Sequence, residues 1–279
     1  MALKTEVVDR IPTYPGRVVL TPVSGATNTY DLTRADQPIE EGTPLNKALF
    51  DQKAYTLTTD VTVYVSTRGN DVSGDGSSAA PYATIQRALD SLPNWFDGHT
   101  ATIDVAAGTY EERVNVDSFQ GGMLVLGNSS SPAVTIRGLS ITNSSTVRIN
   151  IPNIVRSSTL GGVPLKIENG SVVQLNCDLT VDGNGNNLSG ISVETNSLLS
   201  VTFLWNVTSS NNKSAAIAVY TGGRVVLFDL FGSGNSVGLS AETLGMISYT
   251  TNNISATTTY KTGSGGRILN GAQVNVPNY

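Results

Sequence analysis

The chain has 279 residues and a formal net charge of −5, and only 14% of its residues are charged. It contains 28 Gly but a single Cys, so a disulfide scaffold is excluded. Coiled coils and helical bundles need more Glu, Lys and Leu, and nucleic-acid partners usually select basic proteins. The composition therefore favours an all-β protein with many short strands and turns, and we expect no nucleic-acid partner.

The first ten residues lack the apolar core of a secretory signal peptide. The longest apolar runs, such as Ala215–Val219, are far shorter than the roughly 20 residues of a membrane span. We therefore expect synthesis in a cytoplasm without a leader and no insertion into a membrane.

Residues 1–58 form a first region that is rich in Pro and has one strand-like run, Arg17–Leu20. A helix is predicted to begin at Thr43, because Thr suits the N-cap and Pro44 suits the first helical position. Few apolar residues are available for a core, so we expect this region to dock onto a partner or another copy.

Residues 59–112 form a second region. Val61–Val65 and Ala101–Val105 alternate as strands do, and a polar loop follows the first of them. Thr84 is predicted to cap a short amphipathic helix that Pro93 ends.

Residues 113–279 contain an internal repeat. Its starting positions lie 26, 26, 26 and 22 residues apart, at Leu139, Leu165, Ile191, Ile217 and Leu239. Apolar residues recur two, eight and ten positions after each start, with Tyr249 as the one aromatic member. A third apolar pair is predicted in some repeats, as Leu179/Val181 and Trp205/Val207, and Asp182–Asn186 is predicted to be a turn.

This periodicity predicts a solenoid in which each repeat forms one turn of two or three short strands. One turn cannot bury its own apolar face, so stacked turns bury it together. Equivalent residues of neighbouring turns are expected about 4.8 Å apart.

Two stretches of residues 59–112 resemble a known fold. Val63–Ser66, Gly69–Asp71 and Pro81–Leu89 resemble the leading segment of pectate-lyase-like β-helix proteins, and Val105–Tyr110 resembles their first turn. The resemblance implies a right-handed, single-stranded parallel β-helix of about 22–26 residues per turn, with a loop and a short helix capping its N-terminal end.

The first region is similar to the leading segments of phage tail fibre and baseplate-associated proteins, in Arg17–Val23, Tyr30–Asp36 and Gly42–Asn46. The resemblance implies a tailspike-like homotrimer in the virion, with other tail or baseplate proteins and a host surface glycan as partners. It also implies an attachment segment that includes Arg17, Asp31, Arg34, Asp36, Pro44 and Leu45.

Our first interpretation is a non-enzymatic structural protein that contributes to host recognition. A glycan-cleaving depolymerase is the second, because Glu168 and Glu194 share one repeat offset. Stacked carboxylates would lie about 5 Å apart, the separation that a retaining glycosidase uses. The simpler reading is that both are solvated residues beside a turn, and a purely structural connector is the third interpretation.

No cofactor or metal is expected. Asp71 and Asp75 lack the spacing of an EF-hand and are read as turn residues. His99 is the only His of the chain, so His-based triads and zinc sites are disfavoured.

Overall fold

The computed structural model describes residues 11–12, 18–25, 30–34, 38–40, 56–128, 133–201 and 204–271. The chain divides into two compact units, Met1–Ala54 and Tyr55–Tyr279.

The first unit contains two antiparallel strand pairs. One joins β1 (Ile11–Pro12) to β4 (Pro38–Glu40), and the other joins β2 (Val18–Pro22) to β3 (Tyr30–Arg34). The helix predicted from Thr43 lies outside the described residues.

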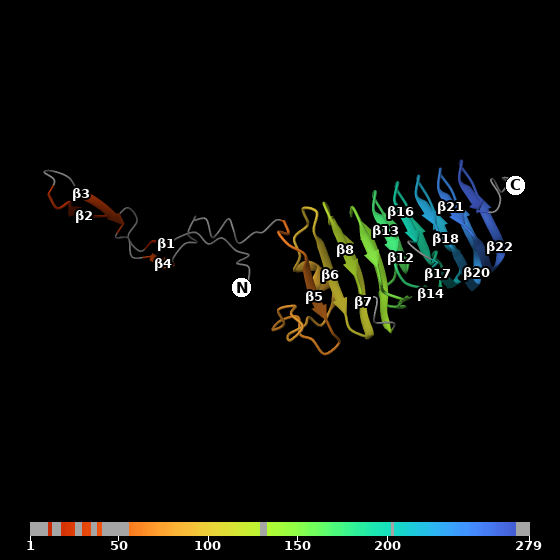
Figure 1. The fold of residues 1–279 in the computed structure, drawn as a ribbon, viewed down its shortest axis with the longest axis horizontal. Coiled ribbons are helices and arrows are strands. Elements are labelled where there is room, and N and C mark those ends of the chain that lie inside the picture. The colour runs from red at the N-terminus through yellow and green to blue at the C-terminus, as the bar shows by residue number, and fades with distance from the viewer. Residues whose placement is uncertain are drawn as a thin grey trace. The chain divides into compact units, whose positions relative to one another are not determined.

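The second unit is a parallel β-solenoid of about seven turns, which confirms the predicted all-β fold class (Figure 1). One sheet of nine strands forms what we name face 1. In spatial order from the N-terminal end, its strands are β5 (Val61–Val65), β6 (Thr100–Val105), β8 (Met123–Leu126), β10 (Val147–Ile149), β13 (Val172–Leu175), β16 (Leu198–Val201), β19 (Arg224–Val226), β21 (Met246–Tyr249) and β23 (Arg267–Asn270).

The remaining strands of the solenoid belong to one connected sheet with two parts, faces 2 and 3. Four long strands contribute to both: β7 (Gly108–Asp117), β9 (Val134–Thr142), β20 (Asp229–Ala241) and β22 (Thr251–Thr262). Face 2 adds β11 (Asn153–Val155), β14 (Leu179–Asn186) and β17 (Asn206–Asn212). Face 3 adds β12 (Leu165–Glu168), β15 (Ile191–Val193) and β18 (Ala215–Val219).

The sequence repeat matches the register of face 3. Leu165 pairs with Leu139 on one side and with Ile191 on the other, and the series continues to Ile217 and Leu239. All five side chains are fully buried. Because residues alternate between the two sides of a strand, every second residue of each short strand enters this shared core.

The third apolar pair was predicted in the wrong register. Leu179 pairs with Val207, not with Trp205, and Val181 pairs with Ser209. Leu179 lies four residues after Leu175, whereas their partners Val207 and Val201 are six residues apart, and these two extra residues shift the alignment.

The turn predicted at Asp182–Asn186 lies inside β14, where the pairing with β17 shifts in register. Asn184 and Gly185 have positive φ there, so the Gly- and Asn-rich stretch bends a strand rather than ending it.

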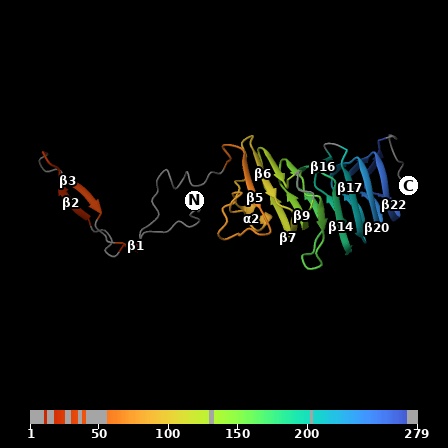
Figure 2. The ribbon, with the colours of Figure 1, turned by 60° about the horizontal axis from the view of Figure 1, so that its bottom comes forward.

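Helix α2 (Ile85–Asp90) lies beside β5 and β6 at the N-terminal end of the solenoid (Figure 2). Thr84 is its N-cap, as predicted, and its hydroxyl accepts a hydrogen bond from the Arg87 amide at 3.2 Å. Ile85, Ala88 and Leu89 are buried against the first strands.

Candidate functional site

The two predicted catalytic carboxylates lie in neighbouring turns at the end of face 3. Glu168 is the last residue of β12, and Glu194 directly follows β15. The Glu194 amide donates to the Ile167 carbonyl at 2.8 Å, which fixes the two residues in one column. Tyr220 and Glu242 continue the column, which we name the carboxylate ladder.

Each carboxylate of the ladder is held by a residue of its own sheet. The Lys166 ammonium lies 2.7 Å from Glu168, and the Ser192 hydroxyl donates to Glu194 at 2.6 Å. The Lys261 ammonium lies 2.7 Å from Glu242 and lowers the pKa of that carboxyl. An ammonium stabilises an ionised carboxylate, whereas a general acid must carry a proton.

Tyr220 is the half-buried member of the ladder. Burial raises the pKa of its hydroxyl, and the negative charges of Glu242 and Glu194 act in the same direction. The phenol therefore stays protonated at neutral pH, and it serves as a hydrogen-bonding group rather than as a base.

The predicted attachment residues belong to the first unit. Asp31 and Arg34 are part of β3, opposite Thr21 and Val18 of β2. The other four predicted residues lie outside the described ranges: Arg17, Asp36, Pro44 and Leu45.

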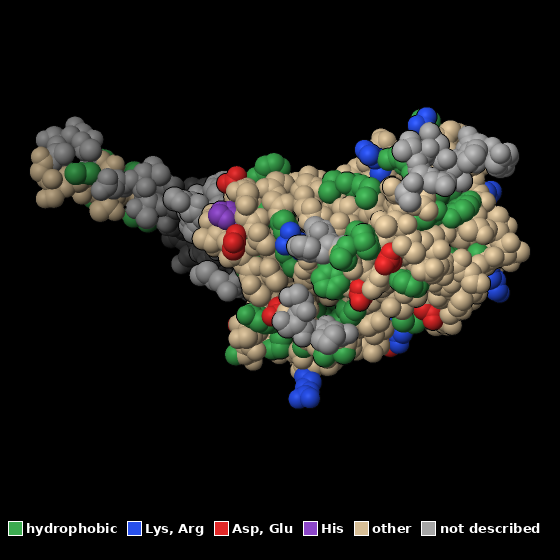
Figure 3. Space-filling view, turned by 45° about the vertical axis from the view of Figure 1, so that its right-hand side comes forward, with side chains coloured by type: hydrophobic (Ala, Val, Ile, Leu, Met, Phe, Trp, Pro, Cys, Tyr) green, Lys and Arg blue, Asp and Glu red, His purple; other side chains and the backbone are tan. Residues whose placement is uncertain are grey.

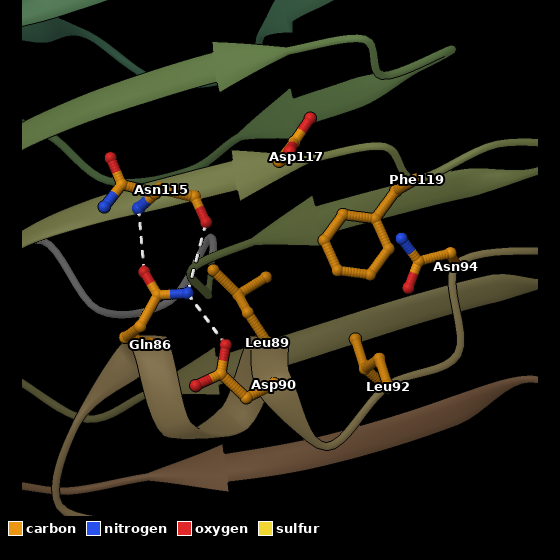
Figure 4. Close-up of a pocket in the computed structure, with 8 residues that line it drawn as sticks. All are labelled: Gln86, Leu89, Asp90, Leu92, Asn94, Asn115, Asp117 and Phe119. Carbon is orange, nitrogen blue, oxygen red and sulfur yellow. Dashed lines mark hydrogen bonds between the residues drawn. The ribbon is translucent and has the colours of Figure 1, made fainter.

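A pocket that was not predicted from the sequence lies between α2 and β7 (Figure 4). Its volume is about 300 Å³. We name it the cap pocket; it is lined by Gln86, Leu89, Asp90, Leu92, Asn94, Asn115, Asp117 and Phe119.

Apolar and polar groups occupy different parts of the cap pocket. Leu89 and Phe119 are 2% and 7% exposed, and with Leu92 they form an apolar centre. The polar side chains surround that centre (Figure 4). A signal was present in the sequence: Gln86 and Asp90 are four residues apart on the helix, and Asn115 and Asp117 alternate on one side of β7.

Gln86 connects the helix to the strand in this pocket. Its Nε2 donates to Asp90 Oδ1 at 3.0 Å and to the Asn115 carbonyl at 3.2 Å, while its Oε1 accepts from the Asn115 amide at 2.8 Å. Both polar atoms of the Gln86 side chain are thus hydrogen-bonded, and the side chain holds Asp90 in place.

Face 1 differs chemically from the other two faces in its outward-facing residues. Two aligned columns of outward-facing residues on this face combine apolar residues with Arg. Neither of the two columns contains an Asp or Glu among the residues that the structure describes. The first runs through Val172, Leu198, Arg224, Met246 and Arg267, and the second through Thr102, Val125, Arg148, Gln174, Ser200, Val226, Ser248 and Leu269.

The corresponding columns of faces 2 and 3 are mostly polar. Face 2 presents Thr109, Thr135, Asn153, Thr180, Thr208, Phe231 and Asn253. The corresponding column of face 3 consists of Asn115, Ser140, Lys166, Ser192, Ala218, Ser240 and Lys261. Of these, Ser192, Ala218 and Ser240 are buried. Partly exposed Val, Leu and Met side chains therefore recur along the outward columns of face 1, whereas face 2 has the single exposed Phe231 in its column. Charged side chains are sparse on the surface drawn in Figure 3.

Comparison with protein-family models, with curated proteins and with solved structures finds no match to this chain. In the ranges that the structure describes, no helix is long and apolar enough to span a membrane. The same ranges contain no group of three or more His, Cys, Asp or Glu that could hold a metal ion.

Proposed function

We propose that the chain is a tail fibre or baseplate-associated structural protein of a phage or phage-tail-like particle, and that it contributes to host-surface recognition. Its N-terminal unit would attach to other tail proteins, and its solenoid would project from them. The resemblance of Arg17–Val23, Tyr30–Asp36 and Gly42–Asn46 to such attachment segments supports this assignment, as does a separate N-terminal unit. A virion location follows from the same proposal.

The observation that carries the proposal is the outward surface of face 1. A solenoid acting alone would be expected to cover its exposed sheets with polar residues, as face 2 does at every position of its column except Phe231. Val226 is 39% exposed, and it shares face 1 with Val125, Leu198 and Met246. Val125, Leu198 and Met246 are intermediate in exposure, and apolar side chains aligned in this way favour a protein–protein contact. We infer that face 1 packs against other copies in a homotrimer.

The test is the molar mass of the full chain in solution, measured by light scattering. We expect three times the chain mass for the native protein and a smaller mass for the double variant Leu198→Glu/Val226→Glu. The matched control places the same charges on face 2, as Thr135→Glu/Thr208→Glu, and should remain trimeric. A native protein with the molar mass of a single chain would contradict the proposed homotrimer.

Host recognition is tested separately, by binding of the native protein to host cells and to arrays of host surface glycans. Binding to either would support recognition. Binding to neither would leave the third interpretation, a connector that contacts only other tail proteins.

The depolymerase alternative has one observation in its favour, the position of Glu168 and Glu194 in neighbouring turns. The Lys166 ammonium at 2.7 Å from Glu168 does not argue against it, because one carboxylate of a retaining pair acts as an ionised nucleophile. Release of reducing ends from host polysaccharide, abolished by Glu194→Gln, would establish cleavage at this pair. Absence of reducing ends with the native protein would leave the non-enzymatic assignment.

A further inference from the structure

We propose that the cap pocket binds a small, uncharged, hydroxyl-rich ligand of the size of one sugar ring. The inference deepens the proposed recognition function and depends on it only for the biological source of the ligand. The pocket is formed by α2 and β7 and is separate from the carboxylate ladder.

The size of the pocket limits the ligand. A volume of about 300 Å³ is at the lower end of the range of roughly 300–1,000 Å³ for small-molecule sites. One ring fits such a space, whereas a longer oligosaccharide would extend beyond it. Leu89 and Phe119 are 2% and 7% exposed, so it is mainly Leu92 that offers apolar surface to the C–H face of a ring.

The surrounding polar groups retain hydrogen-bonding capacity. Asp90 uses Oδ1 for Gln86, and Asp117 uses Oδ1 for Ser118 and Asn143. Among the described residues, the second oxygen of each carboxylate has no partner. The side-chain amide of Asn115 likewise has none, but it points away from Leu89, Leu92 and Phe119 in Figure 4, so the free groups beside the apolar centre are the acceptors.

The charge of the lining selects against other ligand classes. Two carboxylates and no cationic side chain line the pocket, which disfavours phosphates, sulfates and acidic sugars. A calcium ion needs six to eight oxygen ligands, and the apolar centre supplies none of them. A hydroxyl group donates to a carboxylate, so a hydroxyl-rich ring can satisfy the acceptors while its C–H face contacts the apolar centre.

Gln86 adds preorganisation to this site. Because three hydrogen bonds fix its side chain between helix and strand, Asp90 is held in place before a ligand arrives. Ordering the Asp90 carboxylate when a ligand binds therefore costs little free energy.

The experiment is ligand-observed NMR on the full chain with free glucose, galactose and N-acetylglucosamine as probes. We expect saturation transfer to at least one of these sugars, with a Kd on the order of 1 mM. Asp90→Asn and Asp117→Asn should each weaken that binding about tenfold, because each removes a charged acceptor. Asp97→Asn is the matched control: Asp97 is exposed, lies outside the lining and has φ 49°, a backbone conformation that Asn accepts, so binding should be unchanged.

Further competition experiments identify the class of ligand and its biological source. Calcium chloride, choline and glucose 6-phosphate should not compete with the neutral sugar. Competition by host polysaccharide would identify a glycan as the source, whereas binding of free sugars alone would identify a soluble metabolite. The proposal is overturned by absence of saturation transfer, by sugar binding that Asp90→Asn and Asp117→Asn leave unchanged, or by displacement of the sugar by calcium.

Failure of this proposal is distinguishable from failure of the proposed function. If the double variant Asp90→Asn/Asp117→Asn still binds host cells like the native protein, the cap pocket is not the recognition site and the function stands. If the native protein binds free sugar but no host surface, the pocket stands and host recognition fails.

Discussion

Pairs of residues with positive φ form the corner between face 3 and face 1. They have φ values of 57° and 75° at Asn169 and Gly170, and 51° and 59° at Thr195 and Asn196. Gly and Asn tolerate this left-handed conformation, which explains why the sequence repeat has these residues at its turns. The second position of the corner is Gly170, Asn196, Gly222 or Gly265 in other turns, but it is Leu244 in one turn, with φ 65° and a side chain that is 71% exposed.

Leu244→Asn is expected to stabilise the protein by about 1 kcal/mol. The substitution relieves a strained backbone and sacrifices little burial, because the Leu side chain is already largely in solvent. The measurement is the midpoint of urea unfolding. The reverse change at the equivalent corner position, Asn196→Leu, should destabilise by a similar amount; a loss of stability in both variants would contradict the argument.

Cys177 illustrates how burial determines reactivity. Burial, with a smaller contribution from the Asp178 charge, raises the pKa of its thiol to about 12. At pH 8 the reactive thiolate is then only about 10⁻⁴ of the population. We expect iodoacetamide to label folded protein far more slowly than protein in denaturant, as mass spectrometry would show; equal labelling rates would disprove this.

At the scale of elements, α2 is held by two carboxylates from outside the helix. Asp71 accepts hydrogen bonds from the amides of Ala83 and Thr84 and from the Thr84 hydroxyl, at 2.7, 3.0 and 2.8 Å. Glu112 of β7 accepts from the amides of Ile85 and Gln86, at 2.7 and 3.0 Å. These contacts satisfy amides that a short helix leaves unpaired and fix it to the first turn.

Glu112 makes the stability of this cap depend on pH. Burial raises the pKa of its carboxyl, although the two amides act in the opposite direction. The pKa of Glu112 is higher in the folded protein than in the unfolded one. The stability that this shift contributes is therefore fully present below the unfolded pKa and is lost as pH rises through the folded pKa. The native protein's advantage over Glu112→Gln in unfolding free energy should therefore shrink between pH 4 and pH 7.

The neighbouring Glu111 provides a control of opposite sign. A hydrogen bond from Arg137 lowers the pKa of its carboxyl, so the native protein's advantage over Glu111→Gln should grow over the same pH range. Urea unfolding at several pH values measures both differences. The same slope for the two variants would show that the cause assigned to Glu112 is wrong.

The elements show what sequence patterns predict and where they stop. Leu139 to Leu239 align as the repeat indicates, because stacking every turn on the next preserves the spacing. Trp205 was misplaced because a two-residue insertion between strands leaves no mark in an apolar pattern. The cap pocket was missed because it joins a helix and a strand that are nearly 30 residues apart, as Gln86 and Asn115 are.

For the solenoid unit as a whole, stability comes from a continuous core that no single turn completes. Ile167 is fully buried and pairs with Ile141 on one side and Val193 on the other. Ile268 is 2% exposed and, among the described residues, pairs with Ile247 alone. Each turn is therefore stabilised by its neighbours, and an end turn has fewer of them than an inner turn.

The same substitution should therefore have unequal effects at the two positions. Ile167→Ala leaves a cavity between two turns and is expected to cost about 4 kcal/mol, whereas Ile268→Ala should cost about 2 kcal/mol. Hydrogen exchange separates the cases further, because the end variant should loosen β21 and β23 while the inner strands stay protected. Equal losses of stability, with exchange rising along the whole solenoid in both variants, would mean that the turns unfold as a single cooperative unit. In that case stacking would not protect the inner turns from a defect at the end.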